Sequence, residues 1–228
     1  MKPTILAIET ASERCSIALH HQGEVFVRES EQPRGHASLI LPMINEILSE
    51  TKLSLSTLDA LAYSKGPGAF TSIRIGTSVV QGLALGSNLP VASASSLEIM
   101  AQKLAAEEGA VILAALDARM NEVYFGVYQI ENGFAVPLQE DQVAKPNDIL
   151  LGQLLQFSNA YAIGSGWHVY ADAMQARFQD YDVTLATEYY PHALELLDIA
   201  LRHMADDKLH TAEQILPVYI RDNVTHGS

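Results

Sequence analysis

The sequence predicts a duplicated α/β fold of two lobes, because a strand, turn and strand at the start of the chain recur in its second half. Residues 5–8 form an apolar run, residues 9–13 a polar turn, and residues 15–20 a returning apolar strand. The second half repeats this plan with an apolar run over residues 111–117 and a strand over residues 122–129. Segments with helical spacing follow in each half. Two sheets covered by helices suggest an architecture such as the actin-like, sugar-kinase-like fold.

The first lobe continues with a third strand and two long helices. Residues 24–30 predict a strand, and the apolar residues of 36–50 keep the spacing of a helix. A second helix is predicted over residues 71–85, where Thr71 or Ser72 can cap the N-terminus. This helix carries unusually small residues, which let another helix approach closely: Gly76, Ser78, Gly82 and Gly86.

A short strand over residues 91–94 and a helix over residues 97–108 complete the first lobe. We therefore place the N-terminal lobe at residues 1–108 and the C-terminal lobe, with an extended tail, at residues 109–228. No low-complexity linker separates them.

The rest of the second lobe is predicted from three shorter segments and the tail. Residues 161–163 form a strand that leads into a helix near residues 170–178, and residues 215–221 look extended. A further helix over residues 191–204 has a core face formed by Leu194, Leu197 and Leu201.

The composition limits the classes of partner. The 228 residues are 48% hydrophobic, which is enough to fill one large core or two small lobes. Asp and Glu outnumber Lys and Arg by 27 to 14, so the formal charge is −13. This negative charge repels the phosphates of a nucleic acid, so a partner would have to bind any nucleic acid.

Cysteine usage and hydropathy indicate a reducing compartment. Cys15 is the single cysteine and lies in a strand-like segment, where a buried, inert thiol is expected. No signal-peptide core opens the chain, and no apolar stretch approaches the ~20 residues of a membrane span. We expect a soluble, cytoplasmic protein.

A glycine-rich loop follows the apolar run of residues 58–63. Its glycines permit backbone conformations that a side chain forbids, and the N–H groups of the next helix point at whatever occupies the loop. It is not a Walker loop, because Lys65 precedes the glycines, and it lacks the dinucleotide fingerprint. Loop chemistry alone leaves a structural turn and a binding role equally open. Its characteristic residues are Gly66, Pro67, Gly68, Phe70, Thr71, Arg74 and Gly76.

Two polar turns are candidates for approach to a nucleotide. Glu9, Thr10 and Ser12 lie in the first turn, where actin-like folds approach phosphates, and Asp117 lies in the corresponding turn of the second half. Yet the first turn places two carboxylates near any phosphate, which disfavours independent ATP hydrolysis. The alternative for Asp117 is a surface turn with a local ion pair to Arg119.

The sequence motifs give little support for a metal site or for a serine hydrolase. The eight histidines include no pair at i, i+4, and there is no His-Glu-x-x-His motif or cysteine cluster, so we expect no metal site. The sequence around Ser165 lacks the Gly-x-Ser-x-Gly elbow, so a catalytic triad is unsupported.

The two long helices of the first lobe carry broad apolar stripes. Core packing explains such stripes more often than not, but they are wide enough to leave apolar surface for a partner. The partner-surface residues that we predict are Leu39, Met43, Val80 and Leu83.

Four sequence blocks carry a family resemblance. They are Ile5–Thr10, Gly66–Gly76, Asp117–Tyr124 and Pro217–Arg221, and they run from the first strand to the tail. On these blocks the chain resembles the TsaB (YeaZ) family. It departs from the family pattern at Ala69, where serine is common, and at Ser72 and Asn121, where glycine is common.

The resemblance implies an actin-like (ASKHA, ribonuclease H-like) fold and a non-catalytic role in making the threonylcarbamoyl modification of the tRNA adenosine next to the anticodon. It implies a heterodimer with TsaD, which transfers threonylcarbamoyl from an adenylate made by TsaC, and an association with the ATPase TsaE. The first two helices would pack against TsaD or, without it, form a homodimer. No cofactor is expected to bind this chain tightly on its own, while ATP or ADP could lodge at the junction with TsaD. The alternatives are a stand-alone nucleotide-dependent phosphotransferase or hydrolase using Glu9, Thr10 and Asp117, and a glycoprotease, for which the sequence offers neither nucleophile nor metal ligands.

Overall fold

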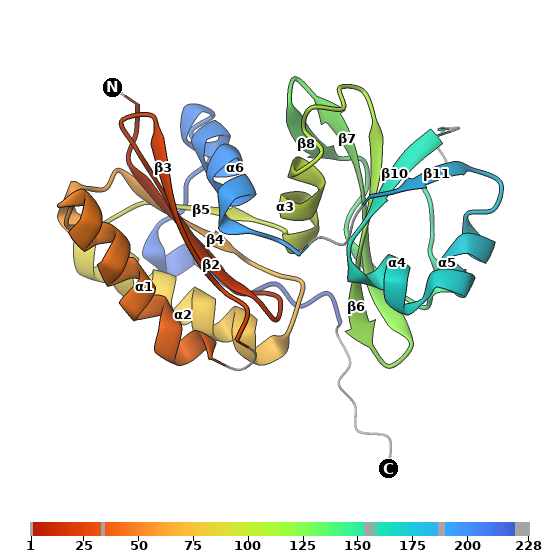
Figure 1. Ribbon diagram of the computed structural model, residues 1–228, viewed down its shortest axis with the longest axis horizontal. Coiled ribbons are helices and arrows are strands. Elements are labelled where there is room, and N and C mark those ends of the chain that lie inside the picture. The colour runs from red at the N-terminus through yellow and green to blue at the C-terminus, as the bar shows by residue number, and fades with distance from the viewer. Residues whose placement is uncertain (1, 33–34, 153–156, 158, 187–189, 222–228) are drawn as a thin grey trace, which may run out of the picture. The chain divides into compact units, whose positions relative to one another are not determined.

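The chain folds into two compact units (Figure 1). A computed structural model describes residues 2–32, 35–152, 157, 159–186 and 190–221. Unit 1 comprises Met1–Ile99 and Tyr190–Pro217, and unit 2 comprises Met100–Tyr189 and Val218–Ser228. The chain therefore passes from one unit to the other three times.

Unit 1 is built on a mixed five-stranded sheet in the order β3-β2-β1-β4-β5. β1 pairs antiparallel with β2 and parallel with β4, and β5 extends the parallel part. The predicted opening of three antiparallel strands is confirmed. The strands are β1 (Ile5–Glu9), β2 (Cys15–His21), β3 (Glu24–Ser30), β4 (Ala60–Ser64) and β5 (Val91–Ala94).

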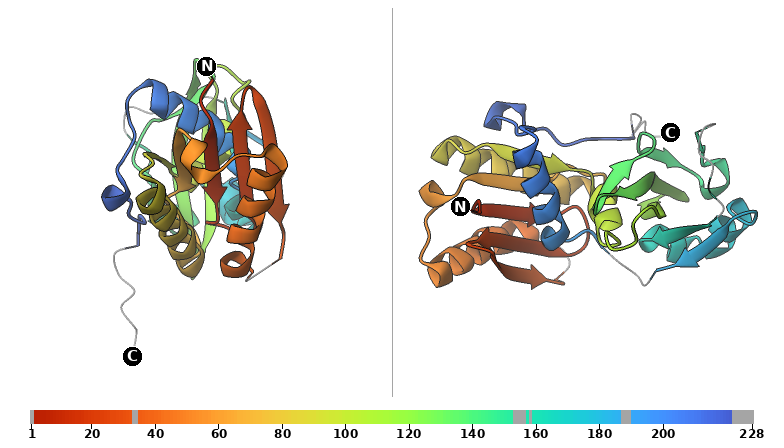
Figure 2. Two further views of the ribbon diagram at one scale, coloured as in Figure 1. Left: turned by 90° about the vertical axis from the view of Figure 1, so that its left-hand side faces the viewer. Right: turned by 90° about the horizontal axis from the view of Figure 1, so that it is seen from above.

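Helices cover both faces of this sheet (Figures 1 and 2). α1 (His36–Thr51) and α2 (Phe70–Ser87) bury their apolar stripes on the face that carries Leu6 and Ile8. α6 (Ala193–Ala205) covers the opposite face, where small side chains let a helix lie close to the strands. Those small residues are Ala7, Ala18, Ala60, Ala62, Ala92 and Ala94.

The return of α6 corrects the predicted lobes at residues 1–108 and 109–228. α6 and the segment that follows it belong to unit 1, because Leu196, Ile199 and Ala200 are buried against the first sheet. His210 also forms a β-bridge with Val91. An amphipathic pattern shows that a helix has an apolar face but not which sheet covers it.

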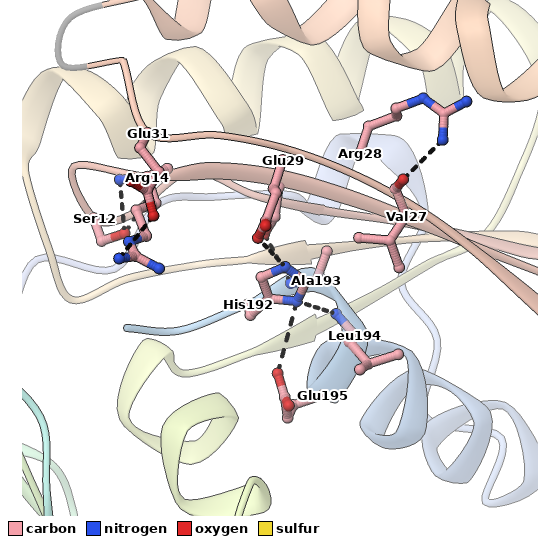
Figure 3. A network of polar contacts seen from close by, with 11 residues as sticks. Ser12, Arg14, Val27, Arg28, Glu29, Glu31, His192, Ala193, Leu194 and Glu195 are labelled. Atoms are coloured by element: carbon pink, nitrogen blue, oxygen red, sulfur yellow. Dashed lines mark hydrogen bonds and ion pairs between the residues drawn. The ribbon is translucent and has the colours of Figure 1, made fainter. Parts of the chain in front are cut away.

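Polar contacts fix the N-terminus of α6 on the sheet (Figure 3). The Ala193 N–H donates to Ser16 Oγ at 2.9 Å, and the Leu194 N–H donates to His192 Nδ1 at 3.0 Å. Since Nδ1 accepts a hydrogen bond, the ring proton lies on Nε2, which is 3.3 Å from a carboxylate oxygen of Glu29 on β3. His192 thus caps the helix and joins it to the edge strand.

Unit 2 repeats the topology of unit 1. Its sheet has the order β11-β10-β6-β7-β8, with β9 paired to β7. Read from the first strand of each unit, both sheets place the second and third strands on one side and two parallel strands on the other. The duplicated actin-like fold is therefore confirmed. The strands are β6 (Val111–Arg119), β7 (Glu122–Glu131), β8 (Phe134–Pro137), β9 (Gln142–Ala144), β10 (Asn159–Ile163) and β11 (Asp182–Leu185).

Short helices and aromatic side chains complete unit 2. α5 (Ala171–Arg177) confirms the helix predicted near residues 170–178, and α4 (Ser165–Val169) is a further short helix before it. Trp167 on α4 donates from Nε1 to the Leu113 carbonyl at 2.9 Å, and its ring centre lies 5.3 Å from that of Phe178. These contacts anchor α4 against the sheet. Short 3₁₀ helices span Leu55–Thr57, Pro146–Asp148 and Ala212–Gln214.

One predicted helix cap and one predicted helix end were wrong. α2 begins at Phe70 with Ala69 as its N-cap residue and no side-chain cap, so Thr71 and Ser72 lie inside the first turn. α3 (Ser96–Gln102) ends well before residue 108, and the residues after it make hydrogen bonds to carbonyls three positions back. The Gln102 side chain, at the end of α3, donates from Nε2 to the Gly133 carbonyl and accepts the Ala135 N–H at Oε1. These two hydrogen bonds join the end of α3 to the second sheet.

The core face predicted for residues 191–204 was partly wrong. Leu197 is buried and Leu201 is partly buried against the first sheet, but Leu194 is 41% exposed. Leu194 lies in the first turn of α6. This end of the helix is held by the hydrogen bonds of its polar cap and not by its apolar stripe.

Candidate functional site

The glycine loop packs directly on the turn between β1 and β2. The Ala69 N–H donates to the Ala11 carbonyl at 2.9 Å. A Cβ atom on Gly68 would lie 2.1 Å from that carbonyl oxygen, so no other residue fits there without movement of the backbone. The Ala69 N–H is thus used by the protein itself.

A second close approach joins the same turn to α2. Thr10 is buried, and its hydroxyl donates to the Ser72 carbonyl at 3.0 Å. A Cβ atom on Gly76 would lie 2.2 Å from the Thr10 Oγ1 atom. Gly68 and Gly76 are therefore explained by the packing of the turn, which favours the structural interpretation of the loop.

The remaining residues of the loop divide into buried and exposed positions. Gly66 and Pro67 are buried, and Gly66 adopts a φ of +96°, a conformation that favours glycine. Phe70, Thr71 and Arg74 are exposed at the start of α2. The Arg74 guanidinium lies 3.8 Å from the centre of the Phe70 ring, so this part of the surface carries a cation–π pair.

Glu9 lies at the end of β1 and is completely buried. Burial raises its pKa to about 8, although hydrogen bonds from Ala11 and Ser64 partly oppose this effect. The Ala11 N–H donates to Glu9 Oε1 at 2.7 Å. Glu9 is therefore mostly a neutral carboxylic acid at pH 7, and the expectation that its negative charge faces a phosphate was wrong.

Ser12 is half-buried in the same turn but is also engaged locally. Its hydroxyl accepts the Arg14 N–H at 3.2 Å, and the Arg14 guanidinium is 2.9 Å from the Glu31 carboxylate (Figure 3). With Glu9 and Thr10 buried and Arg14 paired with a carboxylate, the residues of this turn do not fit a phosphate within unit 1.

Asp117 stabilises the β6–β7 turn in unit 2. Its Oδ1 accepts the Arg119 N–H and the Tyr170 hydroxyl, each at 2.8 Å, and its Oδ2 lies 3.0 Å from Arg119 Nη1. The Asp117 N–H donates to Ser165 Oγ at 3.2 Å. Partial burial and the Asp117 carboxylate raise the pKa of Tyr170, which keeps its hydroxyl a donor. The local ion pair that the sequence left open is present.

Asp117 and the Glu9 turn thus lie in different units, and the structure gives each of them partners within its own unit. Sequence reasoning missed Ser165 and Tyr170 as partners of Asp117. It also missed that Arg221 of the tail contacts this turn through the Ala118 carbonyl and the Glu122 carboxylate. Both ends of that contact lie in blocks that carry the family resemblance, which is the signal that could have linked them.

Metal ligands and membrane spans are not found in the part of the chain that the structure describes. Among those residues, no group of three or more His, Cys, Asp or Glu side chains could hold a metal ion. None of the helices formed by them is long and apolar enough to cross a bilayer.

The predicted partner surface requires correction. Val80 is completely buried and Met43 nearly so, because both pack into the core between the sheet and the two helices. Leu39 and Leu83 are partly buried against the same core. The broad apolar stripes of the two helices therefore pack into the core, as the alternative interpretation proposed. Met43 and Val80 do not face outward.

The outer faces of α1 and α2 carry a different apolar set. Leu41 on α1 is 48% exposed and Leu85 on α2 is 56% exposed. A Cβ atom added to Gly82 or Gly86 would have no neighbouring atom within 4 Å, so this face of α2 is open among the described residues. We call Leu41, Gly82, Leu85 and Gly86 the outer face of α1 and α2.

Comparison with known proteins shows the family. The family model described as "TsaD: tRNA N6-adenosine threonylcarbamoyltransferase" matches residues 27–227. The "tRNA threonylcarbamoyladenosine biosynthesis protein TsaB" of Escherichia coli K12 is 41% identical over 226 residues, which cover 96% of this chain and 95% of that protein. The protein of the same name from Haemophilus influenzae is 38% identical and covers 97% of this chain and 95% of its own length.

Solved structures agree with this assignment. "YeaZ from Pseudomonas aeruginosa" has a TM-score of 0.86 at 39% identity and covers 95% of this chain and 99% of its own. A second structure, described as an uncharacterized protein with similarity to peptidase YEAZ from Pseudomonas aeruginosa, has a TM-score of 0.87 at 39% identity and covers 96% of this chain and all of its own.

The close approach at Gly68 predicts a large difference between two glycine-to-alanine substitutions. Gly68→Ala should destabilise the protein by about 2–3 kcal/mol, since the new methyl group meets the Ala11 carbonyl. Gly82→Ala in the open face of α2 should be neutral or stabilising by about 0.5–1 kcal/mol. Urea unfolding measures both, and equal effects would contradict the assignment of Gly68 to packing.

The buried Glu9 predicts that stability falls as the pH rises. In the unfolded chain the carboxyl ionises above its ordinary pKa of 4.5, whereas in the fold it stays neutral until about pH 8. Ionisation therefore favours the unfolded state progressively across this window, and the loss between pH 5 and 8 should be roughly 3 kcal/mol. Glu9→Gln should remove this pH dependence, while Glu13→Gln at an exposed position should keep it. Urea unfolding at several pH values distinguishes the variants, and a wild-type stability that does not fall from pH 5 to 8 would refute a neutral Glu9.

Proposed function

Because the chain belongs to the TsaB (YeaZ) family of tRNA threonylcarbamoyladenosine biosynthesis proteins, we propose that it is a non-catalytic scaffold and activator subunit of the modifying complex. In this proposal it binds TsaD and, with TsaE, supports transfer of threonylcarbamoyl to the adenosine next to the anticodon. One observation carries the proposal: the candidate catalytic groups make contacts within the chain. Glu9 is buried and neutral, and Asp117 stabilises a turn.

The electrostatics of the chain support a division of labour with a partner. Its formal charge of −13 opposes binding to tRNA phosphates, so a partner supplies that contact. TsaC would supply the threonylcarbamoyl adenylate, and the complex would act in the cytoplasm. We expect no nucleotide to bind tightly to this chain alone, and the packing of the β1–β2 turn by its own side chains and backbone supports this expectation. ATP or ADP would bind where this chain meets TsaD.

The outer face of α1 and α2 is the proposed surface for TsaD. Leu41 and Leu85 supply exposed apolar area, while Gly82 and Gly86 allow a partner helix to approach closely. The same face could pair two copies of this chain when TsaD is absent. A homodimer would then compete with the heterodimer for one surface.

A stand-alone phosphotransferase or hydrolase remains the alternative. It would require Glu9, Thr10 and Asp117 to approach a nucleotide, whereas Glu9 and Thr10 are buried and Asp117 is engaged by Arg119 and Tyr170. Isothermal titration of the isolated chain with ATP discriminates between the two. Tight binding with turnover would favour the enzyme, and weak or absent binding would favour the scaffold.

Reconstitution tests the proposed function directly. A reaction containing TsaC, TsaD, TsaE, ATP, threonine, bicarbonate and tRNA should form threonylcarbamoyladenosine over repeated turnovers only when this chain is present. The modified nucleoside is measured by mass spectrometry after nuclease digestion. Undiminished product without the chain would reject the activator role.

Charged substitutions on the outer face of α1 and α2 should weaken pairing with TsaD without unfolding the protein. We expect Leu41→Asp and Leu85→Asp each to weaken binding by about tenfold or more, because each buries a charge at the centre of an apolar contact. Leu194→Asp is the matched control, since Leu194 is 41% exposed on α6 of the same unit.

Affinity is measured by titration of TsaD, and circular dichroism reports the fold. Unchanged affinity of both outer-face variants would place the TsaD surface elsewhere. Met43→Asp and Val80→Asp are unsuitable for this purpose, because a charge at either buried position would destabilise the core itself.

A further inference from the structure

The turn between β7 and β8 contains an Asn-Gly pair. Glu131 pairs with Phe134, so Asn132 and Gly133 form a two-residue hairpin loop. Their φ values are +54° and +77°, and a type I′ turn requires positive φ at both of these positions. No other asparagine of the sequence is followed by glycine. The pair suits the turn but is chemically vulnerable, because glycine has no side chain to shield its backbone nitrogen from the asparagine amide.

The reaction open to this pair is deamidation, and it needs only water. The Gly133 nitrogen loses its proton and attacks Asn132 Cγ, so that an N–Cγ bond forms and the Cγ–Nδ2 bond breaks. Nδ2 takes up one proton from water and leaves as ammonia. Water then opens the cyclic imide at either carbonyl, which gives aspartate or isoaspartate. Asn132 is exposed, so water reaches it, and the rate depends on how readily the Gly133 N–H is released.

The Glu108 carboxylate accepts hydrogen bonds from both N–H groups of the turn. Its Oε1 accepts the Asn132 N–H at 2.8 Å, and its Oε2 accepts the Gly133 N–H at 3.1 Å. The N–H that must lose its proton is therefore already a donor to a carboxylate. A hydrogen bond to the protonated form and a nearby negative charge both oppose loss of that proton.

Backbone pairing holds Glu108 beside the turn. The Gly109 N–H donates to the Ile130 carbonyl at 2.9 Å, and the Ile130 N–H donates to the Ala110 carbonyl at 3.0 Å. The residues that follow Glu108 are thus attached to the end of β7. Glu108 is exposed, but two charge-assisted hydrogen bonds from a fixed backbone lose less entropy than a bond between mobile groups.

Gln102 anchors the same turn through other atoms. Its Nε2 donates to the Gly133 carbonyl at 3.0 Å, and its Oε1 accepts the Ala135 N–H at 3.0 Å. Gln102 therefore contributes to the rigidity of the turn, whereas Glu108 also engages the nitrogen that attacks. This difference allows the two effects to be separated by substitution.

We propose that Asn132 is a latent deamidation site, and that Glu108 protects it by holding the Gly133 N–H. Isoaspartate would add a methylene group to the backbone between residues 132 and 133, so the two N–H groups would no longer match the two oxygens of Glu108. The register of β7 with β8 and the contacts of Gln102 would be lost with them. Every group involved lies in unit 2, so this protection does not depend on the function proposed above.

Loss of the Glu108 carboxylate should expose the site. Glu108→Ala should deamidate at position 132 about tenfold faster than the wild type, which corresponds to the loss of one charge-assisted hydrogen bond. Glu107→Ala is the matched control, because Glu107 is the neighbouring exposed carboxylate and accepts from the Tyr161 hydroxyl instead. It should deamidate as the wild type does. Peptide mapping by mass spectrometry measures aspartate and isoaspartate during incubation of the full chain at mildly alkaline pH.

Three results would overturn the proposal. One is a wild-type rate in Glu108→Ala. Another is a slower rate in that variant, since Glu108 would then promote the reaction as a general base. The third is a folded wild-type chain that deamidates as fast as the chain unfolded in urea, because no protection would then exist.

Two further variants separate protection of the N–H from rigidity of the turn. Gln102→Met keeps the volume of a buried side chain but removes both anchoring bonds, and it should accelerate deamidation much less than Glu108→Ala does. Glu108→Gln retains a neutral acceptor and should give an intermediate rate. Thermal unfolding reports that each variant is folded. An equal acceleration in Gln102→Met and Glu108→Ala would assign the protection to rigidity and contradict the role of the Gly133 N–H.

Discussion

The packing of the β1–β2 turn against the glycine loop is the constraint on which unit 1 depends. The hydrogen bond from Ala69 to Ala11 and the contact of Thr10 with Ser72 bring the end of β1, the loop and the start of α2 within van der Waals distance. Glycine at positions 68 and 76 is the condition for that approach. The turn therefore lies against the start of α2, and the N–H of its N-cap residue Ala69 is used to organise the fold.

Burial then decides the chemistry of the residues behind the turn. Glu9 lies at the end of β1 and has no route to solvent, so it is held as a neutral acid close to Ser64. In the second unit, the Asp117 carboxylate pairs with Arg119 and accepts a hydrogen bond from the Tyr170 hydroxyl. The two equivalent turns of the duplicated fold therefore both make internal contacts.

Two parts of the surface expose apolar side chains. The main apolar stripes of α1 and α2 face the core, where Ile40 and Val80 are buried. Leu41 on α1 and Leu85 on α2 are exposed. The β6–β7 turn exposes Met120 between two neutralised arginines. These two apolar sites lie in different units.

The strand-turn-strand openings, the long helices, the buried Cys15 and the family could all be predicted from the sequence, since they follow from local periodicity and from motifs such as Gly66–Gly76. The sequence could not show that α6 returns to the first sheet, that Val80 faces inward while Leu85 faces outward, or that Arg221 contacts the turn between β6 and β7. Periodicity shows that a helix has an apolar face but not what covers it. The contacts of Arg221 join residues 103 and 99 positions apart, and they form only when the folded chain brings these residues together.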